Sequence, residues 1–184
     1  MPLVAAAITG GLGIGTDCIR QGLREVSVKG RTQVLQSASH ISTFLIDYAH
    51  NALSMENLLQ MLKGYHPDLL VCLFGAGGNK PKQRRFDMGS MAGKYADLTI
   101  LTTDNPRYET VEEINKAIIE GLDAYGGAYQ VIEDREEAIH YLLDHCGSRD
   151  IVALIGKGHE EYQEIQGVKY HFSEEEVVGK YVQK

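Results

Sequence analysis

Short apolar runs recur along the chain, and longer amphipathic stretches separate them. Segments of about ten to fourteen residues with helical spacing between short strands predict right-handed βαβ crossovers. The expected fold is therefore α/β and Rossmann-like, with a mostly parallel sheet and helices on both faces. The apolar runs expected to form its strands are residues 44–46, 69–74, 98–101, 129–132 and 151–155.

Helix signals lie between these runs. Met55, Leu58, Leu59 and Leu62 recur at helical spacing and predict a helix over residues 54–63. Three further helices are predicted by capping signatures in which a small polar residue precedes a glutamate by three positions. These pairs are Thr110 with Glu113, Asp134 with Glu137, and Ser173 with Glu176.

The two ends of the chain lack the strand–helix alternation of its centre. Residues 2–10 and 16–26 predict two short helices, and residues 27–30 form a natural boundary before the α/β region. Residues 34–46 predict two strands joined by a polar turn, and Gln166-Gly167 predicts a hairpin. We therefore expect one domain over residues 30–184 and a short helical appendage over residues 1–29.

Composition excludes several classes of protein. The 184 residues are 43% apolar and 23% charged, with a formal net charge of −7, which is typical of a globular domain and unlike the basic face that nucleic-acid binding needs. No run approaches 18 apolar residues, and residues 1–9 lack the features of a signal peptide. We expect a cytoplasmic, monomeric protein with no nucleic-acid or membrane partner.

The cysteines and histidines do not predict a metal centre. Cys18, Cys72 and Cys146 are widely separated and odd in number, and the seven histidines form no metal-binding pattern. We therefore expect no metal site and no catalytic residue in this chain, since no serine or cysteine is placed as a nucleophile.

Four predicted strands end in polar or glycine-rich loops. The loops are residues 47–51 (DYAHN), 75–80 (GAGGNK), 104–107 (DNPR) and 156–160 (GKGHE). In a parallel sheet these loops lie along one edge, where ligands of open α/β sheets bind. Asn105 and Arg107 are expected to project from a corner made rigid by Pro106. The plainer alternative is a polar turn in which Asp104 caps the following helix.

The glycine-rich loop is not a nucleotide fingerprint. A G-x-G-x-x-G motif needs glycine where Lys80 stands, and no P-loop sequence is present. Its glycines are expected to let the backbone turn sharply and approach a ligand. The basic residues that follow could form a solvated helix entry. They are Lys80, Lys82, Arg84 and Arg85.

The order GR, DYAHN, FGAGGN, DNPR and GKGHEEYQ resembles the C-terminal domain of the Mur ligases, specifically the UDP-N-acetylmuramoyl-tripeptide synthetase (MurE) branch that adds meso-diaminopimelate. The resemblance covers about residues 30–172, and residues 1–29 resemble the tail of the central domain. It implies that the incoming amino acid is bound by Lys80, Asp104, Asn105, Pro106, Arg107, Gly156 and Glu160. Where Lys80 stands the family normally has an arginine, whose two-pronged contact with a carboxylate lysine cannot reproduce.

The resemblance also implies a second group, which faces the nucleotide and the central domain. This group is Arg31, Asp47, Tyr48, His50 and Asn51. Each could instead be a structural turn residue.

The reaction implied is amide synthesis in a peptidoglycan precursor. ATP phosphorylates a carboxylate of a UDP-muramoyl dipeptide, and the amine of the amino acid attacks the acyl phosphate. In the family, ATP and Mg²⁺ bind mainly to the central domain, so no cofactor is expected in this chain alone and it should be inactive. It could be an excised fragment or a truncated gene product. The alternative is a free-standing, non-catalytic module that binds an amino acid or nucleotide; a reading frame continuing upstream into a P-loop would separate the two.

Overall fold

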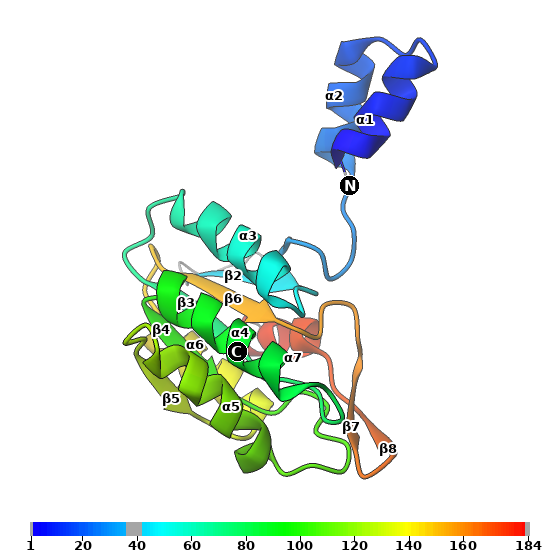
Figure 1. Ribbon diagram of the computed structural model, residues 1–184. Helices are drawn as coiled ribbons and strands as arrows, with labels where there is room; N and C mark the ends of the chain where they lie inside the picture. Colours follow the sequence, from blue (N-terminus) through cyan, green and yellow to red (C-terminus); the bar gives the residue numbers. More distant parts are fainter. Residues whose placement is uncertain (1, 36–41, 183–184) are drawn as a thin grey trace.

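The computed structural model describes residues 2–35 and 42–182, and strand and helix alternate through its centre (Figure 1). The elements in chain order are α1 (Pro2–Gly11), α2 (Thr16–Glu25), β1 (Gln33–Leu35), β2 (Thr43–Asp47), α3 (Ala52–Lys63), β3 (Leu70–Phe74), α4 (Lys82–Tyr95), β4 (Leu98–Leu101), α5 (Val111–Asp123), β5 (Tyr129–Val131), α6 (Arg135–His145), β6 (Ile151–Ile155), β7 (Tyr162–Ile165), β8 (Val168–His171) and α7 (Glu174–Val182).

The main sheet has the strand order β1-β2-β6-β3-β4-β5. Every neighbouring pair is parallel except β1 with β2, which is antiparallel. The register places Asp47, Ile155, Phe74 and Leu101 in one row across four strands. The loops that follow these four strands therefore begin at the same edge of the sheet. The α/β, Rossmann-like prediction is confirmed.

Helices cover both faces of this sheet. On one face α3, α4 and α5 bury a cluster that includes Leu59, Met88 and Ile118 against sheet residues such as Cys72. On the other face α6 and α7 bury Ile139, Leu142 and Val178 against sheet residues such as Leu73. The strands are apolar on both sides because each side meets a helix layer, which is typical of parallel sheets.

The capping signatures form as predicted. Thr110 and Glu113 make a complete capping box at the start of α5. Asp134 accepts a hydrogen bond from the Glu137 amide at the start of α6, and the Ser173 hydroxyl accepts one from the Glu176 amide. The hairpin is also confirmed, since β7 and β8 pair antiparallel around Gln166-Gly167.

The helix α4 was not among the predicted helices. It begins after Pro81, which makes no side-chain cap, and it packs closely on α5 because both helices carry a glycine at their contact. A Cβ atom at Gly89 would lie 2.1 Å from the Ile118 carbonyl oxygen, and one at Gly121 would lie 2.1 Å from the Phe86 carbonyl oxygen. Hydrophobic periodicity misses such a helix because backbone contact replaces large apolar side chains.

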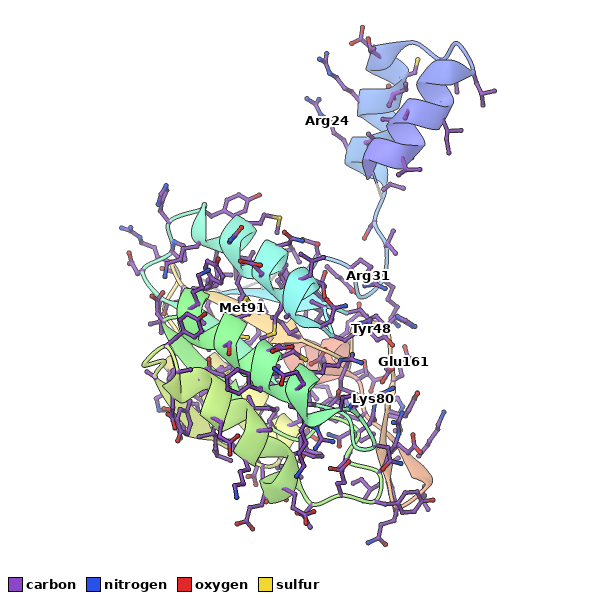
Figure 2. All side chains as sticks on the ribbon, viewed as in Figure 1. Arg24, Arg31, Tyr48, Lys80, Met91 and Glu161 are labelled. Atoms are coloured by element: carbon purple, nitrogen blue, oxygen red, sulfur yellow. The ribbon has the colours of Figure 1, made fainter. Side chains whose placement is uncertain are left out.

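The helices α1 and α2 stand apart from the sheet as a separate hairpin (Figure 1), and Arg24 lies far from the other labelled residues (Figure 2). No described residue of α2 is buried. Ile19 and Leu23 are only half-buried, and Val26 is exposed. Among the described residues, no helix has the length and apolarity needed to cross a membrane. The predicted turn within residues 34–46 falls largely on residues 36–41, outside the described ranges.

Candidate functional site

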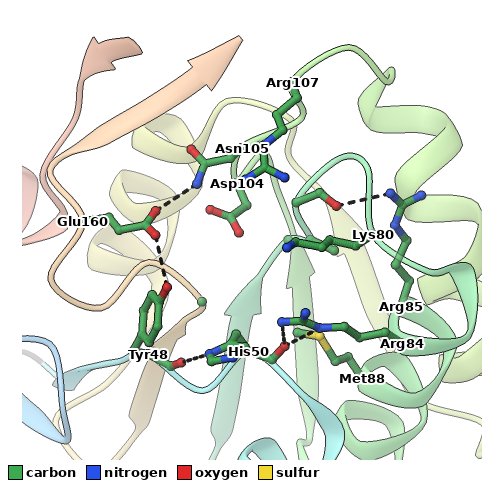
Figure 3. A pocket seen from close by; sticks show the side chains of 14 residues that line it. Tyr48, His50, Lys80, Arg84, Arg85, Met88, Asp104, Asn105, Arg107 and Glu160 are labelled. Atoms are coloured by element: carbon green, nitrogen blue, oxygen red, sulfur yellow. Dashed lines mark hydrogen bonds between the residues drawn. The ribbon is translucent and has the colours of Figure 1, made fainter. Parts of the chain in front are cut away.

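A cavity of about 180 Å³ lies at the edge where β2, β3, β4 and β6 end (Figure 3). We call it the edge pocket. Its lining comes from α4 and from the four loops that follow β2, β3, β4 and β6. These loops meet there because the four strands end in register. The lining residues are Tyr48, His50, Gly75, Ala76, Gly77, Lys80, Arg84, Arg85, Met88, Asp104, Asn105, Arg107, Gly156 and Glu160.

The DNPR loop begins where β4 ends and turns sharply. Arg107 has a φ of +55°, a conformation that residues other than glycine adopt rarely. Pro106 is buried in this corner and does not line the pocket. The alternative in which Asp104 caps the next helix is wrong, because Thr110 is the cap of α5.

Asn105 is held at both ends of its side chain. Its Nδ2 donates to Glu160 Oε2 at 2.9 Å, and its Oδ1 accepts from the Glu164 amide at 2.9 Å. The residue is only 8% exposed. The DNPR and GKGHE loops are therefore joined directly, and the orientation of the Asn105 amide is fixed by its partners.

Arg107 is tied to β7. Its amide donates to the Glu164 carbonyl at 3.0 Å, and its carbonyl accepts from the Gln166 amide at 2.7 Å. In the side chain, Nε lies 3.3 Å from Glu164 Oε2 and Nη1 donates to the Gly78 carbonyl at 2.9 Å. Arg107 thus contacts Glu164 rather than Glu160, although both Arg107 and Glu160 line the pocket.

Glu160 and Tyr48 form the opposite wall. The Tyr48 hydroxyl donates to Glu160 Oε1 at 3.3 Å (Figure 3). Burial, together with the negative charge of Glu160, raises the pKa of Tyr48. The phenol therefore stays protonated and donates to the carboxylate.

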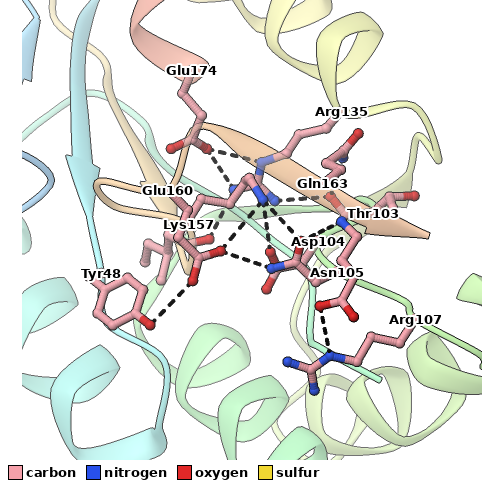
Figure 4. Close-up of polar contacts among 12 residues, drawn as sticks. Tyr48, Thr103, Asp104, Asn105, Arg107, Arg135, Lys157, Glu160, Gln163 and Glu174 are labelled. Carbon is pink, nitrogen blue, oxygen red and sulfur yellow. Dashed lines mark hydrogen bonds and ion pairs between the residues drawn. The ribbon is translucent and has the colours of Figure 1, made fainter. Parts of the chain in front are cut away.

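Lys157 is a site residue that the sequence analysis did not single out. Its side chain is fully buried, with Nζ 3.5 Å from Asp104 Oδ1, 3.4 Å from Asn105 Oδ1 and 3.9 Å from Glu160 Oε2 (Figure 4). Burial lowers the pKa of Lys157, and the carboxylates of Asp104 and Glu160 oppose that shift. A lysine directly after a wholly apolar strand and between two glycines was the available signal.

Lys80 and Arg84 lie on the α4 side of the pocket. Lys80 is exposed, and its side chain reaches across the opening in Figure 3. Arg84 Nε donates to the His50 carbonyl at 2.7 Å. Lys80 therefore remains available to a ligand, whereas Arg84 links two walls of the pocket.

The alternative of a solvated helix entry is wrong for Arg85. This residue is 1% exposed and makes two hydrogen bonds of 2.8 Å to the Glu109 carboxylate. It also donates to the Gly77 carbonyl. These contacts, with Arg85 as the main cause and the Asn79 amide next, lower the pKa of Glu109 to about 2. Arg85 holds the glycine-rich loop in place from behind.

The glycines of that loop have a different role from the one expected. A Cβ atom at Gly75 would lie 2.0 Å from the Thr102 carbonyl oxygen, and one at Gly78 would lie 2.0 Å from the Pro106 carbonyl oxygen. The absence of a side chain at Gly75 and Gly78 makes room for the neighbouring DNPR backbone. A Cβ atom at Gly77 would meet no atom closer than 3.8 Å. Close packing between two loops, rather than approach to a ligand, requires Gly75 and Gly78.

The second predicted group is only partly at the pocket. Tyr48 and His50 line it, whereas Arg31, Asp47 and Asn51 do not. Asp47 is half-buried, and its carboxylate accepts from the Thr32 and Ala49 amides. Asn51 caps α3. The Arg31 guanidinium lies 4.8 Å from the centre of the Tyr48 ring. Asp47 and Asn51 therefore have structural roles that explain their positions.

The edge pocket is lined by charges of both signs. The carboxylates of Asp104 and Glu160 lie near Lys157, and the cations Lys80 and Arg107 line the same cavity, where Lys80 extends from the side opposite Glu160 (Figure 3). Such a cavity can hold a small molecule that carries ammonium and carboxylate groups at once. Within the described ranges, no three histidine, cysteine or carboxylate side chains gather in a way that could hold a metal ion.

Comparisons with known proteins place the chain in a family. The family described as "Mur ligase, glutamate ligase domain" matches residues 30–158. The UDP-N-acetylmuramoyl-L-alanyl-D-glutamate–2,6-diaminopimelate ligase of Caldanaerobacter subterraneus subsp. tengcongensis is 43% identical over 96% of this chain and 36% of its own length. The protein of the same name from Aquifex aeolicus is 44% identical over 90% of this chain and 34% of its own length.

Solved structures show the same fold. A structure of a UDP-N-acetylmuramoyl-L-alanyl-D-glutamate–2,6-diaminopimelate ligase superposes with a TM-score of 0.77 at 34% identity, over 98% of this chain and 37% of that one. UDP-N-acetylmuramate-alanine ligase from Thermotoga maritima, at 20% identity, has a TM-score of 0.65 over 85% of this chain and 33% of that one. The chain spans about a third of the length of the curated relatives it matches. The match of the family to most of the chain, and identities above 40%, establish that the chain belongs to the Mur ligase family and has the fold of its C-terminal domain.

Proposed function

We propose that this chain binds the incoming amino acid, meso-diaminopimelate, for an ATP-dependent ligase that extends a UDP-muramoyl dipeptide in peptidoglycan precursor synthesis. The observation that carries the proposal is the presence of both signs of charge around one small cavity. Asp104, Glu160, Lys80 and Arg107 line a cavity of about 180 Å³, a volume suited to a small amino acid rather than to a drug-sized ligand.

Three of the four charged groups of the ligand have a partner of opposite charge. Diaminopimelate carries an ammonium and a carboxylate at both ends. In this proposal Glu160 accepts a hydrogen bond from the distal ammonium, Arg107 binds the distal carboxylate and Lys80 binds the other carboxylate. Lysine lacks the distal carboxylate, so its binding would leave Arg107 without that partner, and sites built around a polar group discriminate strongly against such analogues.

The chemical steps need groups beyond this pocket. Formation of an acyl phosphate requires charge neutralisation on the transferred phosphoryl group, and this sequence contains no P-loop. We assign ATP and Mg²⁺ mainly to the ligase's central domain. Residues 30–184 would form the amino-acid-binding domain and residues 1–29 the tail of that central domain. Arg31, Tyr48 and His50 would face the nucleotide, and the chain would be a monomer. A cytoplasmic location stays a prediction.

Binding by the 184-residue chain tests the proposal. ¹⁵N-labelled chain is titrated with meso-diaminopimelate and, separately, with L-lysine, and amide shifts are followed by NMR. We expect saturable shifts from diaminopimelate at residues of the edge pocket, with a dissociation constant at least about tenfold lower than that of lysine. Equal affinity for both amino acids would contradict the proposed selectivity.

The main alternative is a free-standing, non-catalytic binding module. Both readings predict no ATP hydrolysis by this chain, so ATPase activity does not separate them. Addition of the remaining domains of a diaminopimelate-adding ligase does, because a ligase domain should restore tripeptide synthesis and a separate module should not. ATP turnover by the purified chain that a substitution in the edge pocket abolishes would contradict both.

A further inference from the structure

Glu164 of β7 makes three separate contacts with the DNPR loop. Its amide donates to Asn105 Oδ1 at 2.9 Å, its carbonyl accepts from the Arg107 amide at 3.0 Å, and its carboxylate lies 3.3 Å from Arg107 Nε. One residue of the hairpin therefore orients the side chains of Asn105 and Arg107, and Glu164 itself does not line the edge pocket.

These contacts fix the direction of the Arg107 guanidinium. Nε of Arg107 donates to the Glu164 carboxylate, and Nη1 donates to the Gly78 carbonyl. Within the described part of the chain, Nη2 of Arg107 makes no hydrogen bond. The side chain is 30% exposed, so without these partners it would sample several rotamers, whose loss on binding a ligand is unfavourable.

Glu164 also gives Arg107 a carboxylate partner outside the pocket lining. Asp104 and Glu160 line the same small cavity as Arg107. A guanidinium released from Glu164 would have these carboxylates as its next partners, and pairing with them would cancel both charges that a zwitterion needs. The Glu164 carboxylate pairs with Arg107 from outside the cavity. The charges of Arg107, Asp104 and Glu160 therefore do not cancel one another inside it.

We propose that Glu164 is a positioning residue that presents Arg107 to the distal carboxylate of the ligand, which makes the β7–β8 hairpin a determinant of amino-acid selectivity. This inference rests on the proposed function of the edge pocket. The opposite reading, in which the Glu164 carboxylate competes with that of the ligand, predicts tighter binding when Glu164 is removed. The two readings therefore predict changes of opposite sign.

Two substitutions separate them. Glu164→Ala removes the carboxylate but keeps the backbone contacts, whereas Glu164→Gln keeps an oxygen that can accept from Arg107 Nε. In NMR titrations of the 184-residue chain, we expect Glu164→Ala to weaken diaminopimelate binding about fivefold or more and Glu164→Gln to weaken it by less than about threefold. Unchanged or tighter binding by Glu164→Ala overturns the proposal.

A double-mutant cycle with Arg107→Ala tests whether Glu164 acts through Arg107. In the Arg107→Ala background, Glu164→Ala should have no further effect on diaminopimelate affinity, and neither substitution should weaken lysine binding as much as it weakens diaminopimelate binding. Equal losses in both backgrounds would show a general structural effect and overturn the proposal. Glu176→Ala is the matched control, since Glu176 contacts His171 of β8 outside the pocket.

A measurement without ligand keeps this inference distinct from the proposed function. The Arg107 Nε–H cross-peak should be observable in the wild-type chain and in Glu164→Gln, and it should shift or broaden in Glu164→Ala. A cross-peak unchanged in Glu164→Ala overturns the positioning role whether or not diaminopimelate binds. Absence of diaminopimelate binding to the wild-type chain, with the Glu164-dependent cross-peak present, overturns the proposed ligand but supports the positioning of Arg107.

Discussion

The Asn105 amide donates a 2.9 Å hydrogen bond to the Glu160 carboxylate across 55 positions of sequence. This bond joins the DNPR and GKGHE loops, which follow the strands β4 and β6 on either side of β3. The two motifs therefore contribute directly bonded residues to one cavity.

Arg107→Ala should reduce the preference for diaminopimelate over lysine by about 2 kcal/mol, near the lower end of the range for truncating one member of a charge pair. We expect a loss near the lower end of this range because the Arg107 side chain is 30% exposed. Dissociation constants for both amino acids measure the change. Tyr108→Ala is the control, since Tyr108 is 72% exposed; an equal loss in that variant would contradict a specific role for Arg107.

Lys80→Arg should tighten diaminopimelate binding by about threefold, because a guanidinium can bind a carboxylate with two parallel hydrogen bonds and an ammonium cannot. Lys80 is exposed at the pocket, so the larger group fits without displacing packed atoms. Titration of both chains with diaminopimelate provides the measurement. Lys82→Arg, outside the pocket lining, should leave the affinity unchanged; weaker binding by Lys80→Arg would show that the position does not contact a carboxylate.

Gly158→Ala should destabilise the fold by about 2 to 4 kcal/mol. Gly158 has a φ of +54°, and an added Cβ would lie 2.5 Å from Tyr48 Cβ. Gly179→Ala is the contrast, because it lies in α7 with open space around it and should stabilise the helix by about 0.5 to 1 kcal/mol. Urea denaturation measures both free energies of unfolding, and similar values for the two variants would contradict the close contact at Gly158.

Breaking the Arg135–Glu174 ion pair should cost about 3 to 5 kcal/mol of stability. Both side chains are at most 1% exposed, with Arg135 Nη2 2.7 Å from Glu174 Oε1 (Figure 4). Arg135→Met leaves a buried carboxylate without its partner, whereas Arg135→Met combined with Glu174→Leu removes both charges. The double variant should therefore unfold at a higher urea concentration than Arg135→Met alone, and additive losses would show that the pair is not coupled.

The Arg85–Glu109 pair should make stability depend on pH. The pKa of Glu109 is lowered from 4.5 to about 2 in the folded chain, so its contribution is present above about pH 4.5 and is lost as pH falls towards 2. Glu109→Gln should cost about 1 to 3 kcal/mol at pH 7, and this difference from wild type should shrink between pH 4.5 and pH 2. Glu112→Gln serves as the control. A difference that stays constant over this range would contradict the depressed pKa.

Local sequence signals predicted the fold well because they act within one element. The apolar runs, the Thr110 capping box and the Gln166-Gly167 turn each specify a short segment, and parallel pairing then brings the strand ends to one edge. The expected gathering of Asn105 and Glu160 followed from that geometry alone. Their assignment to an amino acid came from the family resemblance and is tested only by the experiments above.

Charged residues buried by distant partners could not be predicted in the same way. The sequence did not single out Lys157 and offered Arg85 as part of a solvated helix entry, because lysine and arginine are rarely buried without partners. Their partners lie 53 and 24 positions away, and no local pattern identifies them. Glu164 was missed for the same reason, since its contact with Arg107 exists only once the hairpin packs beside the DNPR loop.

The position of β6 has a consequence for how the molecule forms during synthesis. This strand lies between β2 and β3, although residues 151–155 come after both in the chain. A chain that has left the ribosome only as far as residue 150 therefore exposes β2 and β3 without the strand that joins them, and the sheet is complete only once residues 151–155 have emerged. Late insertion of a central strand is a non-local step, which slows folding. The nascent chain should need protection from aggregation until β6 is made.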